Sequence, residues 1–113
     1  MAVSPGYQQF VVEQLERVGS ITTRRIFGGV GLYADALYFA FIDEDRLYFK
    51  VDDGNRPDYA AVEMGPFRPY GDERTMPYYE VPVEVLEDPD ALAVWAGKAL
   101  DVARRAKRPK RRS

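Results

Sequence analysis

Apolar residues at helical spacing open the chain. Between Tyr7 and Val18 they recur every three or four positions, which places them on one face of a helix. Ser4 and Pro5 come just before this stretch; serine suits a helix cap, and proline suits the first helical position. The pattern predicts an amphipathic helix over about 5–18 that covers one face of a sheet.

Short apolar runs between turn-forming segments follow this helix. Aromatic and β-branched residues alternate with polar or glycine-containing segments at 28–29, 34–35 and 43–45, as expected for consecutive strands joined by tight turns. These runs predict strands near 21–27, 30–34, 36–43 and 46–51.

The predicted strand at 36–43 is apolar on both faces. Strict alternation places Leu37, Phe39 and Phe41 on one face and Tyr38, Ala40 and Ile42 on the other. A face open to water would carry polar residues. The strand is therefore covered on both sides within the chain, or its second face is buried against another subunit. Because the sequence offers one layer of helices, we expect a homodimer.

The strand at 46–51 alternates more cleanly than its neighbour. Leu47, Phe49 and Val51 are expected to face the core, and Tyr48 and Lys50 to face outward. This strand is therefore expected to lie nearer to solvent.

The second half of the chain predicts a short helix, two proline-flanked strands and a long helix. Extended segments at 67–70 and 76–81 belong at a sheet edge or have proline at their ends. Asp88 and Pro89 open a helix that runs to about residue 106. Together the elements predict an α+β domain. We expect two layers, with an antiparallel sheet of about five strands flanked by N- and C-terminal helices.

Cysteine and histidine are both absent from the 113 residues. Their absence excludes cysteine nucleophiles, thiolate and imidazole metal sites, and Ser-His-Asp triads. Carboxylate catalysis and an oxygen-ligand metal site stay open, because 18 acidic residues are available. The leading expectation is a protein with no catalytic residues, no cofactor and no metal site.

The chain has the length of one domain and no apolar run of the roughly 20 residues that span a bilayer. No charged segment followed by an apolar stretch opens it, so no signal peptide is expected. The expected location is the cytoplasm, without membrane contact.

Charge is divided unevenly along the chain. Seven of the 16 basic residues lie after residue 103, which leaves 9 basic against 18 acidic residues in 1–103. We expect a domain over 1–106 and a basic disordered tail over 107–113. The tail is either a solvated extension or a weak, sequence-independent contact for nucleic acid. The candidate nucleic-acid residues are Arg104, Arg105, Lys107, Arg108, Lys110, Arg111 and Arg112.

A glycine-rich segment beside two arginines is the candidate ligand or partner site. Segment 27–31 lacks G-x-G-x-x-G spacing and joins strand to strand, so one interpretation is a tight turn or bulge. The other is a small anion or partner peptide held beside basic residues. The candidate residues are Arg24, Arg25, Phe27, Gly28, Gly29, Lys50, Arg56 and Tyr79.

Eight tyrosines and six phenylalanines allow two interpretations. Aromatic side chains on a sheet can stack the bases of a single strand. They also pack well within strands, and the body of the chain is acidic. Packing in the core or a dimer is therefore favoured over base stacking.

Several ordered blocks of residues resemble one known family. They include RIFGGVGLY at 25–33, LYFA at 37–40, LYFKVD at 47–52 and MPYYEVP at 76–82. These blocks are similar to the N-terminal domain of the TfoX/Sxy family, and the resemblance runs over about 7–105. A stand-alone copy is expected, without the helical C-terminal domain. Ala36 and Pro77 depart from the family pattern, which has glycine and serine there.

The resemblance implies a two-layer α+β fold similar to type III secretion chaperones, often dimeric. It also implies a relation to the bacterial regulators of natural competence that give the family its name. We expect a non-enzymatic binding or regulatory domain that acts through an unknown protein partner. Two alternatives stay open: a small enzyme with carboxylate, lysine or tyrosine chemistry, and a dimeric peptide-binding protein like a chaperone.

Overall fold

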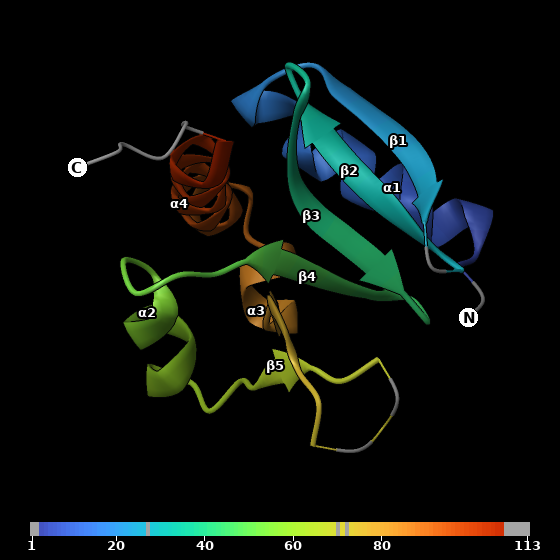
Figure 1. Cartoon of the computed structure of the whole chain (residues 1–113). Coiled ribbons are helices and arrows are strands. Elements are labelled where there is room, and N and C mark those ends of the chain that lie inside the picture. The colour runs from blue at the N-terminus through green and yellow to red at the C-terminus, as the bar shows by residue number, and fades with distance from the viewer. Residues whose placement is uncertain (1–2, 27, 70, 72, 108–113) are drawn as a thin grey trace.

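The computed structural model describes residues 3–26, 28–69, 71 and 73–107, which form one antiparallel sheet and its helices (Figure 1). The sheet has six strands in the order β1-β2-β3-β4-β6-β5. The strands are β1 Ile21–Ile26, β2 Gly29–Ala34, β3 Leu37–Asp43, β4 Arg46–Lys50, β5 Pro66–Phe67 and β6 Met76–Glu80. The helices are α1 Pro5–Leu15, the 3₁₀ turn η1 Glu16–Val18, α2 Arg56–Ala61, α3 Val83–Leu86 and α4 Pro89–Lys107.

α1 and α4 cover the same face of the sheet, which confirms the predicted α+β class and its two layers. Both contribute to one hydrophobic core, which includes Val11 and Leu15 of α1, Leu92 and Ala96 of α4, and Phe39 of β3. The sixth strand, β5, is a two-residue addition at the sheet edge opposite β1. Within the described residues, no helix is both long and apolar enough to cross a membrane.

Polar side chains fix where the two long helices begin. The Ser4 hydroxyl accepts a hydrogen bond from the N–H of Tyr7 at 3.4 Å. Asp45 in turn accepts from the N–H and hydroxyl of Ser4, at 2.8 and 2.9 Å, which joins the start of α1 to the β3–β4 turn. At α4, the Asp88 carboxylate accepts from two N–H groups of the first turn, at 3.1 and 3.2 Å. Both caps confirm the sequence prediction.

A β-bulge in β3 breaks the predicted alternation. In the register between β2 and β3, the adjacent residues Leu32 and Tyr33 lie opposite Ala40 and Tyr38, which leaves Phe39 as an extra residue. The extra residue reverses the faces of the rest of the strand, so Phe39 and Ala40 both join the main core. The strict alternation predicted for this strand is therefore wrong beyond Phe39.

A second, aromatic cluster fills the face of the sheet that α1 and α4 leave uncovered. Phe41, Tyr48 and Tyr78 form this cluster and are buried. Phe67 of β5 closes over it, with its ring centroid 5.4 Å from that of Phe41 and 4.9 Å from that of Tyr48. Because β5 lies three strands from β3, the sheet curls to bring these rings together. Tyr48 is thus buried, contrary to the prediction that it faces outward.

The curled sheet also changes the basis of the predicted homodimer. The dimer was predicted because β3 has two apolar faces. The second face is now covered by Phe67 of the same chain, since Phe41 is only 2% exposed. This surface therefore gives no reason for a dimer, and the dimer stays a prediction.

Gly29 and Gly31 of β2 make room for the rings of β3. A Cβ at Gly31 would lie 3.0 Å from Cε1 of Tyr38. A Cβ at Gly29 would lie 2.8 Å from Cζ of Phe41 and would overlap the backbone carbonyl oxygen of Ile42. Glycine in a strand often marks such a close approach. The structural interpretation of the glycine-rich segment is therefore correct for these two residues.

Replacing Gly29 by alanine tests this close approach. We expect Gly29→Ala to lower the free energy of unfolding by about 2–3 kcal/mol, because the strand backbone cannot move away from the added methyl group. Gly97→Ala is the matched control: it lies in α4 with nothing within 4 Å of the new Cβ and should stabilise by about 1 kcal/mol. Urea unfolding measures both, and equal effects would contradict the packing described.

Candidate functional site

β1 is an open edge of the sheet. It pairs with β2 on one side, and no described strand pairs with its other side (Figure 1). The four residues 22–25 are exposed, and Ile21 and Ile26 at the two ends are half-buried. Both the side chains and the outer backbone of β1 are therefore accessible to a partner.

The hydrogen-bond register decides which backbone groups of β1 are free. Asp35 lies opposite Ser20 in the β1–β2 register, and its N–H donates to the Ser20 carbonyl at 3.3 Å. Hydrogen-bonded and non-hydrogen-bonded pairs alternate along an antiparallel ladder. Residues 22, 24 and 26 therefore bond to β2, and residues 21, 23 and 25 turn their N–H and C=O groups outward.

A groove of about 670 Å³ runs between α1 and β1. Its walls include Val12 and Glu13 of α1, Glu16 of η1, and Ile21, Thr23 and Arg25 of β1. Glu13 and Glu16 are exposed, and the Glu13 carboxylate accepts a hydrogen bond from the side chain of Gln9 at 3.1 Å. The groove therefore combines a few apolar side chains with two exposed carboxylates.

A second cavity, of about 590 Å³, adjoins the groove where β1 turns into β2, and Gln8, Thr23 and Arg25 line both. Arg24, Arg25 and Gly28 line it together with Gln8 and Val30, and no carboxylate does. Within the described part of the chain, no ion pair engages either arginine. The charges along β1 are therefore uneven: the two arginines lie near its C-terminal end, and of these two hollows only the groove is lined by carboxylates.

The structure brings together only part of the predicted ligand or partner site. Arg24, Arg25 and Gly28 share the cavity, whereas Phe27 lies outside the described residues. Gly29 follows directly and serves the close packing of β2 on β3. The predicted grouping with Lys50 is not found, because Lys50 lies on β4, three strands away from β1.

Lys50 belongs to a separate hollow of about 230 Å³. Its Nζ lies 5.2 Å from the ring centroid of Tyr38, a cation–π distance. Burial lowers the pKa of Lys50, and burial together with Tyr78 raises the pKa of Tyr38. The rest of the hollow is lined by Ala36, Leu37, Ala103 and Ala106, which are apolar.

Arg56 and Tyr79 lie together at a third place, beside α2. The Arg56 guanidinium pairs with Asp53, and hydrogen bonds to Asp53 and then to Tyr79 raise the pKa of Arg56. The Tyr79 ring contacts Tyr59, with centroids 5.6 Å apart, and Tyr59 contacts Trp95 at 4.7 Å. Tyr79 is therefore part of the packing between α2, β6 and α4, and the exposed Arg56 contacts it from the surface.

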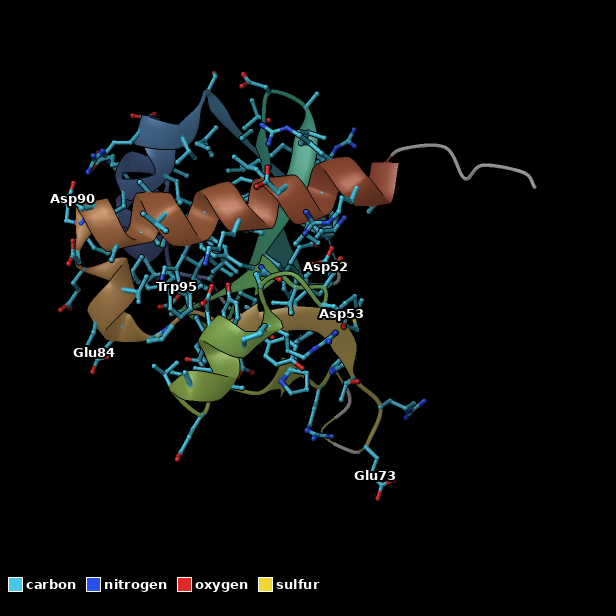
Figure 2. All side chains as sticks on the ribbon, turned by 90° about the vertical axis from the view of Figure 1, so that its left-hand side faces the viewer. Asp52, Asp53, Glu73, Glu84, Asp90 and Trp95 are labelled. Atoms are coloured by element: carbon cyan, nitrogen blue, oxygen red, sulfur yellow. The ribbon has the colours of Figure 1, made fainter. Side chains whose placement is uncertain are left out.

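Two of the predicted nucleic-acid residues form ion pairs within the domain. Arg104 donates to Asp101 at 2.8 Å, and Arg105 donates twice to Asp52, at 2.8 and 2.9 Å. Asp52 lies on the loop between β4 and α2, near the C-terminal half of α4 (Figure 2). α4 includes Lys107, one residue beyond the expected domain end. The predicted residues Arg108, Lys110, Arg111 and Arg112 lie outside the described residues.

The fold defines a two-layer α+β domain, and a family comparison is consistent with this class. The model of the TfoX N-terminal domain matches residues 13–103. The chain therefore belongs to the TfoX N-terminal domain family, which supports a regulatory type of domain. A comparison with curated proteins finds no match.

The groove between α1 and β1 was not predicted from the sequence. Helical spacing predicted that α1 packs against the sheet. It did not show that the side of α1 that carries Glu13 leaves the edge of β1 uncovered. A signal was present in β1 itself: four polar or charged residues in succession, 22–25, occupy both faces of a strand. A strand that is polar on both faces is typical of a sheet edge.

The bidentate pair between Arg105 and Asp52 ties α4 to the β4–α2 loop and predicts a pH dependence. The hydrogen bond from Arg105 lowers the pKa of Asp52 below its ordinary value of 3.8. A carboxylate with a lowered pKa in the folded state stabilises the fold above its unfolded pKa, and this stability is lost as the pH falls through the folded pKa.

We therefore expect Arg105→Gln to lower the urea midpoint slightly at pH 7, by less than Gly29→Ala does. The difference from the wild type should shrink below pH 3.8. Arg104→Gln is the control, because its partner Asp101 lies on the same helix. A loss that persists undiminished at pH 2.5 would contradict the assignment of this stability to the ionised Asp52.

Proposed function

We propose that the chain is a non-enzymatic regulatory domain that acts by associating with another protein chain along the open edge of β1. The observation that carries the proposal is the edge itself. Residues 21, 23 and 25 of β1 turn outward N–H and C=O groups that no described strand pairs, beside a groove and two exposed arginines. An edge with unpaired backbone groups is a template for pairing with another chain.

Family membership supports the regulatory part of the proposal. The TfoX N-terminal domain match covers most of the chain, and the resemblance relates the family to regulators of competence. The shifted Lys50 and Tyr38 are the groups most suited to chemistry, yet the hollow they share offers them only apolar neighbours. We base the regulatory proposal on the family and on the edge of β1, not on this hollow.

Site-specific photo-crosslinking tests the proposal. A photoreactive amino acid replaces Thr23, whose backbone groups face outward, and in a control variant replaces Glu84, which is exposed on α3 (Figure 2). We expect irradiation in cells to give a discrete protein adduct at Thr23 and none at Glu84. The absence of any adduct specific to Thr23 would overturn the proposal that β1 is an association site.

A second, auxiliary contact is proposed for the basic tail. Seven basic residues after residue 103 stand against an acidic body, and clustered cations attract phosphate. The ion pairs of Arg104 and Arg105 leave this role to the residues that follow α4.

The tail is tested by replacing Arg108, Lys110, Arg111 and Arg112 with glutamine, which leaves α4 and its ion pairs intact. We expect the wild type to bind labelled DNA weakly, with affinity that falls steeply between about 50 and 200 mM salt. The variant should lose this binding in fluorescence anisotropy. Equal binding by both proteins, or binding by neither, would show that the tail is not a nucleic-acid contact.

A further inference from the structure

We infer that the chain occupying the β1 edge is a second copy of this protein, paired antiparallel to β1 about a two-fold axis at Thr23. This inference rests on the proposed function, since it names the partner held at the same edge. It does not rest on the apolar faces of β3, which are covered within the chain.

The backbone register permits one centred pairing. Only residues 21, 23 and 25 turn their hydrogen-bonding groups outward, so each must face an outward residue of the second copy. When the antiparallel pair is centred on Thr23, the Thr23 residues of the two copies lie opposite each other. Ile21 of each copy then lies opposite Arg25 of the other. All three outward residues of each strand are then used, and the two sheets become continuous. The symmetry makes the interface self-complementary.

Charge along the edge favours this antiparallel arrangement. The two-fold axis brings the Arg25 end of one copy to the Ile21 end of the other, where Glu13 and Glu16 line the groove. Arg25 lies on the same sheet face as Ile21 and α1, since residues 21, 23 and 25 share a face. Each Arg25, which lines the groove of its own chain, is therefore brought towards Glu13 and Glu16 of the second copy. These carboxylates and Arg25 have no ion pair among the described residues of a single chain.

The same register keeps like charges from facing each other directly. Arg24 lies opposite Thr22 of the second copy, and Arg25 lies opposite Ile21. A pairing centred on Arg24 would place two arginines in direct opposition, which is unfavourable. A single strand pair is also a small interface, so the dimer should dissociate on dilution.

Disulfide trapping tests the register, and the chain has no cysteine of its own. In the inferred dimer, the two Thr23 Cα atoms are about 5.5 Å apart, within the span of a disulfide. The two Thr22 residues are offset by two positions along the strands, so the distance between their Cα atoms exceeds that span. We expect Thr23→Cys to form a covalent dimer under mild oxidation at least about tenfold faster than Thr22→Cys. Equal rates would overturn the register.

Charge exchange tests the contact in a way that does not depend on cysteine chemistry. Two variants are compared: one carries Arg25→Glu, and the other carries both Glu13→Lys and Glu16→Lys. We expect each to raise the dissociation constant of the dimer about tenfold in sedimentation velocity, because like charges then face each other in both halves of the symmetric interface. Mixing the two variants should restore a heterodimer, since both of its halves are then attractive. Arg104→Glu is the control with the same change in net charge as Arg25→Glu. Circular dichroism checks that each variant is folded.

The outcomes separate this inference from the proposed function. A monomer at every concentration, or no heterodimer from the mixed variants, would overturn the second copy as occupant. If Thr23 then crosslinks to a different protein, the edge is still an association site and the proposed function stands. If Thr23 crosslinks to nothing, both fail.

Discussion

Gly29 and Gly31 let the rings of Phe41 and Tyr38 lie directly against the backbone of β2, and much of the architecture depends on this contact. The bulge at Phe39 turns Phe41 to this face, while Phe39 itself stays in the main core. The curl of the sheet then brings Phe67 over the same cluster. One short chain thereby buries both faces of its central strands.

This closure determines where the molecule can associate. The helices cover one face of the sheet, the curled β5–β6 end covers the aromatic cluster on the other, and the β5 edge is short and begins with proline. What remains is β1, with polar residues on both faces and a groove beside it. The uneven charge beside it, with two arginines near its C-terminal end and two carboxylates lining the groove, is the basis of the partner orientation that we propose.

Much of the fold could be predicted from the sequence, because its signals are local. Ser4 and Asp88 marked the helix starts, and the short apolar runs marked four of the strands. The bulge could not be predicted, since alternation assumes two residues per repeat and Phe39 breaks that count without a change in composition. The sixth strand was missed in part because two residues carry no periodicity. The prediction that Lys50 lies beside Arg24 was wrong. The distance between them is set by the order of the strands in the sheet, which depends on long-range pairing.

The claim that the chain covers both faces of its own sheet and leaves β1 as its long open edge is tested most directly by amide hydrogen exchange of β1. In dilute protein, the account predicts slow exchange at Thr22, Arg24 and Ile26, which bond to β2, and fast exchange at Ile21, Thr23 and Arg25. The fast set should gain protection as the protein concentration rises. Equal protection of all six amides at every dilution, or fast exchange at all six, would contradict the account.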